Sequence, residues 1–479
     1  MKHLFLLFAT AIYSSSFSQT WVDSLDYYAR ESYKTPQQYT WTWQNAALLH
    51  AIEIQYELFP ERQDEYLEYV RIAMDRNLLI ANGIFPNGVA SGNGMAFMHR
   101  ITGEQKYIDA AYRVLNDYNN IIRTSNGGVS HIAYAPELWD DTVYMIGVYL
   151  LAMYRATGNE QFLDEIISQI KLHQEKLKDN DWGLWVHGWD GNNVYDIDFC
   201  SEPDWADPVT RRSHEIWGRG NGWVVVTLSE ILKTIDETHE EYEFIANSLV
   251  EMIENLPDLQ DESTGHWYQL PVKPNLANNY LESSCTAMFG YGILTAMQHD
   301  LVSGDTYKDA VERAYYGLRE NSIIPLINHP NKPYLTTTNV AKETCIGDED
   351  YYININIGNG KTYALAVNII FGRAFEEEYF YEIPTSVLAD NHINSIKIYP
   401  SVLASNQLLN IAINAKADNH IRFEIIDIMG RTIHQNSNVI TIGSQTEQLD
   451  ISMLNKGQYF LSVKGNAGEI LKQSSFLVQ

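Results

Sequence analysis

Apolar residues recur every three or four positions from about residue 21 to residue 375, which is the spacing of amphipathic helices. Thr102-Gly103-Glu104 and Thr157-Gly158-Asn159 divide this pattern in the same way, because in both a glycine ends one helix and a polar residue opens the next. A repeat of roughly 55 residues indicates helix hairpins stacked around a shared core. The twelve predicted helices span residues 22–33, 41–58, 63–82, 92–102, 104–122, 141–156, 160–178, 218–235, 239–255, 283–299, 305–320 and 359–375.

The loops before the helices predicted at residues 141, 218 and 283 are long and rich in aromatic residues and glycine. Twelve helices form either an open solenoid or a closed double ring. Loops at the mouth of a closed ring all open on one face, and such a face suits a binding cleft. We therefore expect an all-α (α/α)6 barrel, a six-hairpin toroid, over residues 19–380.

The pattern changes near residues 383–386 to short alternating segments, which predict strands at 396–399, 409–413, 421–428, 458–463 and 476–478. We expect a linker over residues 381–394 and a small all-β sandwich over residues 395–479. A carbohydrate-binding sandwich is the alternative, but all eleven Trp residues of the chain lie at or before Trp267. Sugar-binding sandwiches usually present an exposed aromatic platform, so the composition argues against that alternative.

The first residues predict a secretory signal over 1–18. Lys2 and His3 precede an apolar run that ends at Tyr13, and the small residues Ser16 and Ser18 follow it. A short membrane anchor is the alternative interpretation. No later run is long and apolar enough to predict a transmembrane segment.

The net charge of −28 and the pI near 4.8 argue against nucleic acid and anionic membranes as partners. Any anionic substrate must therefore be held by local Arg and His side chains. Cys200, Cys285 and Cys345 are far apart and form no C-x-x-C pair. Export permits a disulfide, but we expect the three thiols to be simply buried, and we expect neither a metal nor a cofactor.

The stretch Trp217–Trp223 holds two indoles, three glycines and Arg219. Trp offers a flat apolar face that stacks on a sugar ring, glycine lets the backbone approach a bound group, and the Arg fork matches a carboxylate. The stretch predicts a pocket floor for an anionic sugar. A glycine-rich turn that leads into a helix, with its Trp residues in the core, is the alternative.

Asp140 and Asp141 begin a predicted helix directly after Trp139, and seven of the eleven Trp residues lie between Trp139 and Trp223. Asp140 would be the N-cap, and Asp141 would project from the first turn into the mouth of the ring. Among indoles its carboxyl would be poorly solvated and kept protonated, as a general acid requires. Two helix-capping carboxylates are the alternative. A second catalytic carboxylate is not evident by spacing, although four candidates exist: Asp190, Asp207, Glu215 and Glu282.

Five motifs together resemble glycoside hydrolase family 105, the unsaturated rhamnogalacturonyl and related glucuronyl hydrolases. They are Trp139–Met145, His187–Asp190, Trp217–Trp223, Gly265–Gln269 and Asn279–Ser284. The resemblance covers roughly residues 21–375. It implies a metal-free (α/α)6 barrel that removes a 4,5-unsaturated uronic acid from the non-reducing end of an anionic oligosaccharide, of ulvan or rhamnogalacturonan origin. The family hydrates the double bond and needs only one acid/base carboxyl.

By motif position, the resemblance implies that Asp141 is the acid/base. It implies that Arg219 and His187 hold the substrate carboxylate and ring, and that Trp217 and Trp223 form stacking walls. Our candidate substrate-binding residues are therefore Trp41, Trp43, Asn93, Trp139, His187, Trp189, His214, Trp217, Arg219 and Trp223. Relatives often carry a second Asp in the loop before the fourth helix, whereas this loop, residues 87–94, has no carboxylate. Asn87 or Asn93 would have to replace it by hydrogen bonding.

The tail resembles the C-terminal sorting domain of type IX secretion, in Ile398–Ser401, Ile426–Arg431, Leu449–Ile451 and Leu454–Phe460. This resemblance implies a partner, the type IX machinery, and a secreted or cell-surface location. Two other functions stay open at this point. One is another (α/α)6 enzyme, an inverting glycosidase or a polysaccharide lyase with Tyr144 or Tyr280 as base. The other is a non-catalytic surface protein that captures sugars.

Overall fold

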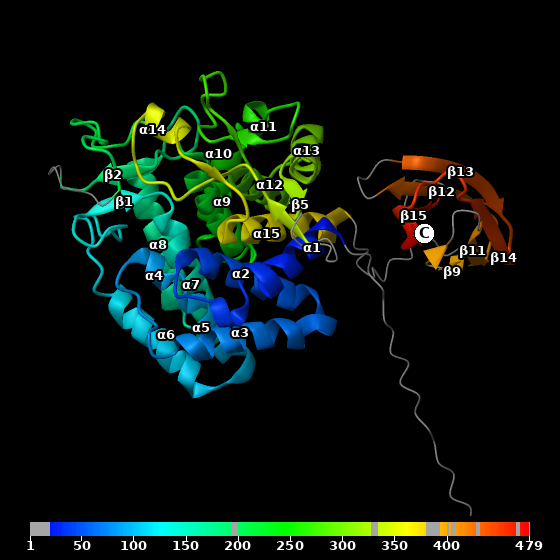
Figure 1. Ribbon diagram of the computed structural model, residues 1–479, viewed down its shortest axis with the longest axis horizontal. Helices are drawn as coiled ribbons and strands as arrows, with labels where there is room; N and C mark the ends of the chain where they lie inside the picture. The colour runs from blue at the N-terminus through cyan, green and yellow to red at the C-terminus, as the bar shows by residue number, and fades with distance from the viewer. Residues whose placement is uncertain are drawn as a thin grey trace, which may run out of the picture. The chain divides into compact units, whose positions relative to one another are not determined.

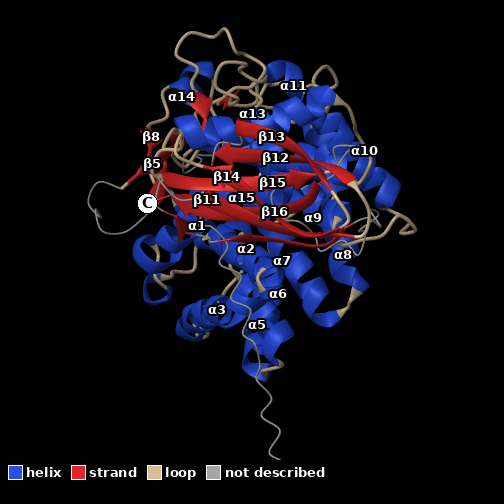
Figure 2. Ribbon diagram, turned by 90° about the vertical axis from the view of Figure 1, so that its right-hand side faces the viewer, coloured by secondary structure: helices blue, strands red, loops and turns tan. Residues whose placement is uncertain are grey.

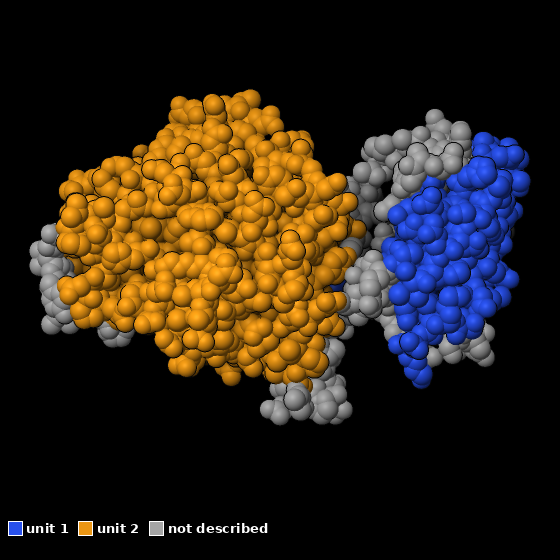
Figure 3. Space-filling model, turned by 90° about the horizontal axis from the view of Figure 1, so that it is seen from above, with its two compact units in different colours: residues 1–20, 381–479 blue, residues 21–380 orange. Residues whose placement is uncertain are grey.

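The computed structural model describes residues 20–192, 200–326, 334–379, 393–399, 402–403, 408–427, 432–465 and 470–478. The expected signal segment and most of the expected linker lie outside these residues. The chain divides into two compact units, one spanning Trp21–Phe380 and one comprising the remaining residues (Figure 3).

Each of the twelve helices predicted from periodicity is present in the first unit (Figure 1). They are α1 (Trp21–Tyr28, extended by η1, Ala29–Tyr33), α2 (Trp43–Leu58), α3 (Gln63–Asn77), α5 (Gly92–Thr102), α6 (Gln105–Tyr118), α7 (Thr142–Thr157), α8 (Glu160–Leu177), α9 (Gly218–Leu232), α10 (Tyr242–Ile253), α12 (Ser283–Gln298), α13 (Asp305–Asn321) and α15 (Thr362–Tyr379). Periodicity did not predict the short helices in the connections, which are α4 (Pro86–Val89), α11 (Leu256–Leu259), α14 (Glu349–Ile353), η2 (Pro36–Gln38) and η3 (Pro60–Arg62).

Six of the described helices follow one another in a cyclic order of contacts. Helix α2 packs on α5, α5 on α7, α7 on α9, α9 on α12, α12 on α15, and α15 back on α2. Each also packs on an outer helix, which is respectively α3, α6, α8, α10, α13 or α1, and some contact a second outer helix. Every residue of α9 is buried, whereas the outer helix α6 buries only one face. A helix enclosed on all sides is buried all round, whereas a helix on a surface buries only the face that packs on its neighbours.

Short hairpins collect at the N-terminal ends of the inner helices. Strand β1 (Glu137–Trp139) pairs with β2 (Gly188–Asp190) before α7, and β3 (Trp267–Tyr268) pairs with β4 (Leu281–Glu282) before α12. Strands β7 (Val340–Ala341) and β8 (Ile357–Gly358) pair before α15. Backbone bonds from His187 to Glu215 and from Gly218 to Gln269 join these loops to one another. The long loops therefore meet at one end of the helices, and a further hairpin, β5 (Ile323–Pro325) with β6 (Leu335–Thr337), lies after α13.

The second unit contains two sheets that share one apolar core (Figure 2). One sheet has the strand order β10-β16-β15-β12-β13 and the other has the order β14-β11-β9. Buried side chains such as Ile411, Phe423 and Leu461 fill the core. The strands are β9 (Ile393–Tyr399), β10 (Val402–Leu403), β11 (Leu408–Ala415), β12 (Asn419–Asp427), β13 (Thr432–Ile440), β14 (Gly443–Asp450), β15 (Gly457–Lys464) and β16 (Ile470–Val478).

Two observations bear on export and membranes. Within the described parts of the chain, no helix combines the length and apolar character that a bilayer crossing requires. Cys200 and Cys345 form a disulfide, and Cys285 is buried as a free thiol. The expectation that all three thiols are simply buried is therefore wrong for two of them. Their separation of 145 residues carries no pairing signal, because only the fold brings the two loops together.

Candidate active site

Two adjacent carboxyl groups lie where β1 leads into α7. Asp140 is fully buried and Asp141 is 8% exposed. The backbone N–H of Asp140 donates to the carbonyl of His187, so the hairpin partner β2 fixes the approach to the helix. We expected Asp140 at the N-cap, but Asp141 occupies that position and its side chain makes no capping bond. The helix therefore does not use the Asp141 carboxyl, which stays available for chemistry.

Burial makes both carboxyl groups hold their proton more tightly than usual. Loss of solvation raises the pKa of Asp141, and attraction to His131 and Arg219 opposes that rise. Loss of solvation and the neighbouring charge of Asp141 raise the pKa of Asp140 well above its ordinary value. Because the two groups interact, they titrate as a pair.

Aromatic rings enclose this acid pair on several sides. The imidazole of His131 stacks on Trp139, with ring centroids 4.4 Å apart and planes 7° apart. The imidazole of His187 packs edge-on against Trp139 at 5.2 Å and tilted against Trp217 at 4.4 Å. Trp139, His187 and Trp217 were predicted from their motifs, and the structure brings the three together beside the acid pair.

His131 was not predicted as a site residue. Its Nδ1 lies 3.4 Å from Oδ1 of Asp141 and 2.9 Å from the hydroxyl of Thr142. It belongs to the loop before β1, where no helical or strand period marks it. The one signal in the sequence is its place in the glycine-rich loop before the helix at residue 141.

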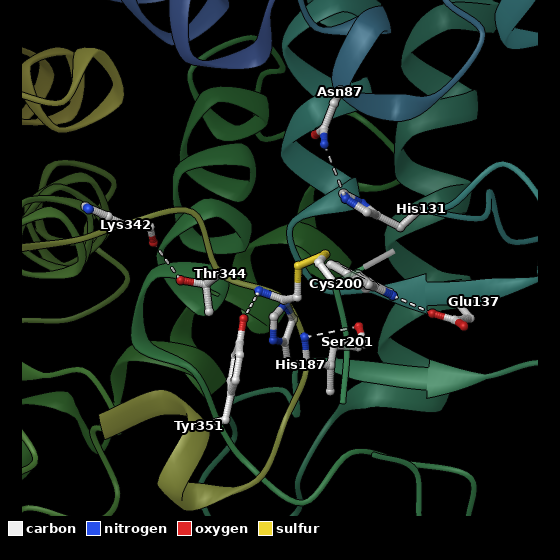
Figure 4. The surroundings of a disulfide bond; sticks show 12 residues. Asn87, His131, Glu137, His187, Cys200, Ser201, Lys342, Thr344 and Tyr351 are labelled. Atoms are coloured by element: carbon white, nitrogen blue, oxygen red, sulfur yellow. Dashed lines mark hydrogen bonds between the residues drawn. A yellow bond between two sulfur atoms is a disulfide. The ribbon is translucent and has the colours of Figure 1, made fainter. Parts of the chain in front are cut away.

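The loop that lacks a carboxylate reaches His131, the neighbour of Asp141. Nδ2 of Asn87 lies 3.5 Å from Nε2 of His131, and Figure 4 shows the two side chains pointing toward each other. Asn93 instead donates to the carbonyl of Ala46 and accepts from its neighbour Gly94, and it is buried. Of the two candidate amides, Asn87 therefore lies in the site, whereas Asn93 supports the backbone of α2 and α5.

His187 connects the acid pair to a distant part of the chain. Its Nδ1 is 2.7 Å from the hydroxyl of Tyr352 in α14, and its Nε2 is 3.9 Å from Oδ1 of Asp140. Complete burial lowers the pKa of His187 well below its ordinary value, so the ring stays neutral. A neutral imidazole bonded to a tyrosine has a fixed orientation. Tyr352 was also absent from the sequence-based set, because its partner is 165 residues away.

Arg219 makes its contacts inside the protein. Its guanidinium donates to the carbonyls of Ala341 and Lys342 and to the hydroxyl of Thr344, and it lies 3.6 Å from Oε1 of Glu282. Only 1% of the residue is exposed. We expected this group to grip the substrate carboxylate; in the structure its contacts hold a segment that reaches His187 through Tyr352.

That segment, residues 340–358, is called the strap below, and it runs from β7 through α14 to β8. The disulfide from Cys345 ties it to the loop at Cys200, and Ser201 accepts a bond from the N–H of Ile346 (Figure 4). Lys273 bridges Glu349 of the strap to Glu215. The strap is therefore attached around the site through several groups, among them Arg219, the disulfide, Ser201, Tyr352 and Lys273.

The Trp residues of the first hairpin lie at the same end of the helices. Trp43 is half-buried and stacks on Tyr363 with ring centroids 5.0 Å apart. Trp223 is only 1% exposed and packs beneath Trp43 and against Tyr144. Trp43 can therefore present a ring face, while Trp223 supports it from below. Trp41 is half-buried and donates from its indole to the carbonyl of Asn82.

Trp189 and His214, both predicted, also do not join the acid pair. Trp189 is paired with Leu138 in the β1–β2 register, one position away from Trp139, so its side chain points to the opposite face of the hairpin. The guanidinium of Arg211 lies 4.4 Å over its ring there. His214 is exposed, and its electrostatic contact is with Asp207. Both residues were expected near the acid pair because they are close to site motifs in sequence. Proximity in sequence does not specify the face of a strand or loop to which a side chain points.

Asp140, Asp141 and His187 are also close enough to share a cation. Their carboxylate and imidazole atoms all lie within 4.8 Å of one another, and within the described residues no other set of acidic, His or Cys side chains does so. Burial raises the pKa of both carboxyls and so favours their protonated forms. We therefore interpret the cluster as an acid centre.

A profile of Glycosyl Hydrolase Family 88 matches residues 13–377. The chain belongs to Glycosyl Hydrolase Family 88. This family 88 enzyme carries a second match, to a secretion system C-terminal sorting domain, over residues 397–475. The sorting domain indicates export to the cell surface or the medium, as the tail predicted.

Individual relatives agree with the family. The unsaturated rhamnogalacturonyl hydrolase YesR of Bacillus subtilis (strain 168) is 27% identical over 286 residues, which is 58% of this chain and 74% of that protein. The unsaturated 3S-rhamnoglycuronyl hydrolase of Alteromonas sp. (strain LOR) is 23% identical over 37% of this chain and 39% of that protein. A solved family 105 glycoside hydrolase from C. acetobutylicum ATCC 824 superposes with a TM-score of 0.65 at 21% identity, covering 75% of this chain and all of that chain. The resemblance to family 105 is thus confirmed, and the family 88 protein is a glycoside hydrolase.

Proposed function

We propose that this enzyme removes a 4,5-unsaturated uronic acid from the non-reducing end of oligosaccharides that polysaccharide lyases generate. The carrying observation is the geometry of the acid pair: one buried carboxyl, Asp140, lies behind one slightly exposed carboxyl, Asp141, among Trp139, Trp217 and two imidazoles. The names of the relatives, both hydrolases of unsaturated substrates, support the same reaction.

In this reaction the double bond between C4 and C5 is hydrated. Asp141 donates its proton to C4, which leaves a cation at C5 stabilised by the ring oxygen. Water adds at C5 while the Asp141 carboxylate takes a proton from it, so the acid is regenerated. The hemiketal at C5 opens to a ketone, the hemiacetal at C1 then collapses to an aldehyde, and the rest of the oligosaccharide leaves as an alcohol.

The scheme explains why a single accessible carboxyl is enough. Ordinary glycosidases place two carboxyl groups on either side of the scissile bond. Asp140 lies behind Asp141, fully buried, and cannot act from the opposite side of a sugar. Hydration needs one group that gives and takes a proton at neighbouring carbons, which is what Asp141 offers.

The neighbouring residues orient this acid. We assign His131 and Asn87 to positioning the Asp141 carboxyl, because the chain of contacts from Asn87 through His131 ends on its Oδ1. Trp43, Trp139 and Trp217 are assigned to the walls that stack on the sugar. His187, held by Tyr352, is assigned to the ring or carboxylate of the substrate.

We also infer that the cyclic order of inner helices is the closed (α/α)6 toroid expected from the sequence. The return contact between α15 and α2 supports closure. The acid pair lies at the start of α7, at the end where the long loops meet, which fits a terminal sugar entering from that mouth and hence exo action.

Charge near the strap favours a neutral sugar next to the uronate. A cavity of about 580 Å³ borders the strap and is lined by the carboxylates of Glu202, Glu343 and Asp350 and by one cation, Lys342. A sulfate group there would meet more negative than positive charge. We therefore propose an unsulfated neighbour, as in rhamnogalacturonan fragments, over a sulfated one, as in ulvan.

The experiment that tests the function follows the ultraviolet absorbance of the conjugated double bond in lyase-generated oligosaccharides. The wild-type enzyme should erase the absorbance, and Asp141→Asn should reduce the rate by about 100-fold or more, the scale of a lost general acid. Asp140→Asn is the matched control and should keep most of the rate, because an amide mimics a carboxyl that stays protonated. Wild-type turnover in Asp141→Asn would refute the assignment.

The same assay separates the other candidates. A polysaccharide lyase creates the absorbance, and a sugar-capture protein binds without changing it. A panel with sulfated and unsulfated neighbours tests the charge argument. Faster turnover of the sulfated substrate would contradict it.

A further inference from the structure

One buried hydrogen bond connects the strap to the imidazole beside the acid pair. The hydroxyl of Tyr352 lies 2.7 Å from Nδ1 of His187, and both residues are completely buried. The imidazole is held between Trp139 and Trp217, with ring centroids 5.2 and 4.4 Å away. Tyr352 belongs to the same apolar cluster as Trp217. The phenol and the imidazole therefore keep one relative orientation.

This hydrogen bond can run in one direction only. The hydroxyl oxygen of Tyr352 already accepts from the backbone N–H of Gly347. The hydroxyl hydrogen needs an acceptor of its own, because a buried donor without one is strongly disfavoured. Among the described residues, Nδ1 of His187 is the acceptor within hydrogen-bond distance of this hydroxyl. Tyr352 therefore donates, and Nδ1 accepts with its lone pair.

The direction of the bond fixes the tautomer of His187. Burial raises the pKa of Tyr352 well above its ordinary value, so the phenol keeps the hydrogen that it donates. Burial also lowers the pKa of His187 well below its ordinary value, so the ring is neutral. A neutral imidazole carries hydrogen on one nitrogen and a lone pair on the other. Because Nδ1 uses its lone pair, the ring hydrogen is on Nε2.

Nε2 is the nitrogen that faces the acid pair. It lies 3.9 Å from Oδ1 of Asp140, and an oxygen of Asp141 is also within 4.8 Å. The atom is buried, and no group in the described parts of the chain forms a hydrogen bond with it. The N–H of His187 is thus placed beside the two carboxyls and is not used elsewhere in those parts.

The place of this hydrogen decides how His187 affects the acid. A lone pair on Nε2 would accept from a protonated carboxyl and would hold the proton that the reaction needs. An N–H group instead donates to a carboxylate, so it stabilises the form that Asp141 takes after giving its proton away. A neutral imidazole N–H does not itself release its hydrogen near neutral pH, and Asp141 stays the proton donor.

We propose that Tyr352 is a positioning residue, which fixes His187 as the tautomer with hydrogen on Nε2 and so makes it a donor toward the acid pair. The effect on turnover rests on the proposed function, whereas the tautomer rests on the contacts of Tyr352. The two residues are 165 positions apart, so the strap sets the hydrogen-bonding state of a distant segment.

Nitrogen NMR of the full chain, isotope-labelled at the histidine nitrogens, tests the tautomer. Ring nitrogens with and without hydrogen resonate in separate regions, and the resonances missing from His187→Leu are those of His187. Near neutral pH the wild type should carry the hydrogen on Nε2. In Tyr352→Phe at least part of it should move to Nδ1, because Nδ1 loses its donor and a protonated carboxyl can donate to Nε2.

Tyr351→Phe is the matched control. It removes the neighbouring hydroxyl of the strap, which accepts from the N–H of Cys345 and is not bonded to His187. The variant should therefore keep the wild-type tautomer.

Turnover in the absorbance assay is the second readout. Tyr352→Phe should lower kcat by about 5- to 10-fold, the scale of one hydrogen bond, and change KM less. In the His187→Leu background, Tyr352→Phe should cost less than about twofold more, because its hydroxyl acts through the imidazole.

Three results would overturn the proposal. They are hydrogen on Nδ1 of His187 in the wild type, an unchanged tautomer in Tyr352→Phe, and an undiminished loss of kcat from Tyr352→Phe in the His187→Leu background. Circular dichroism checks that the variants fold, and the wild-type spectrum tests the tautomer without them. If the wild type does not erase the absorbance but the tautomer still depends on Tyr352, the proposed function is wrong and this assignment stands.

Discussion

The two carboxyls of the acid pair differ in exposure, although they are adjacent in sequence, because each has different neighbours. Asp140 presses against Gly220 at the first turn of α9, where a β-carbon would overlap its carboxyl oxygens. Asp141 keeps a small opening and a histidine partner. Glycine at 220 therefore makes room for a fully buried acid, Asp140, beside a slightly exposed one, Asp141.

This division predicts how Asp140 affects stability. Its pKa in the folded protein is raised well above its ordinary value, which is about 3.9 in an unfolded chain. A carboxyl with a raised folded pKa gives stability that is complete below the unfolded value and is lost as pH rises through the folded value. Asp140→Asn should therefore raise the melting temperature above that of the wild type at pH 8, with little gain near pH 4. Melting curves across that range check this, and a gain independent of pH would contradict it.

A second prediction at the residue scale concerns the contribution of Arg219 to stability. Removing it leaves Glu282, which is fully buried, without its cation. Breaking a buried pair from one side costs about 3–5 kcal/mol. Arg219→Ala should lose that much in urea unfolding, and adding Glu282→Gln should recover part of it. If Arg219 only grips the substrate, the variant will keep wild-type stability and change KM alone.

Residue by residue, the sequence led to Asp141, Trp139 and Trp217 because their motifs stand directly before helices whose N-terminal ends meet, and to His187 through the family resemblance of its motif. It did not lead to His131 or Tyr352. His131 lies in an irregular loop and Tyr352 lies in the five-residue helix α14. Each acts through a contact with a residue elsewhere in the chain, and such contacts leave no period to detect.

At the scale of elements, the helices were the predictable part. An inner helix such as α9 is buried all round and rich in apolar residues, and an outer one such as α6 has a single apolar stripe, so composition and period mark both. The strap was not predictable. Its pieces, β7, α14 and β8, have two to five residues each and are held by distant groups such as Arg219.

The strap gives a prediction about the disulfide. Cys200→Ser, Cys345→Ser and the double variant all lack the same bond, so each should lose a similar amount of stability, about 2–4 kcal/mol. Each should also lower turnover, because Tyr352 and the groups bound by Arg219 would no longer be fixed over the acid pair. Unfolding curves and the absorbance assay measure both effects, and reducing agent should impose them on the wild type. Full activity in the double variant would show that the strap needs no tether.

For the whole molecule, the helical unit contains every residue assigned to the chemistry, and the sorting domain contains none. A chain ending at residue 380 should therefore keep kcat/KM within about twofold of the full chain while failing to leave the cells that make it. Assays of the purified short chain and of culture fractions test the two halves of this prediction. A large loss of kcat/KM would mean that the tail supports catalysis.

The bond between Cys200 and Cys345 has a consequence for where the enzyme matures. Thiols of this kind stay reduced in a cytosol and pair only in oxidising surroundings. In a newly made chain the strap therefore lacks its disulfide, and the bond forms only after export from the cytosol. Protein produced in a reducing cytosol should accordingly be a mixture of chains with and without the Cys200–Cys345 bond until it is treated with an oxidant.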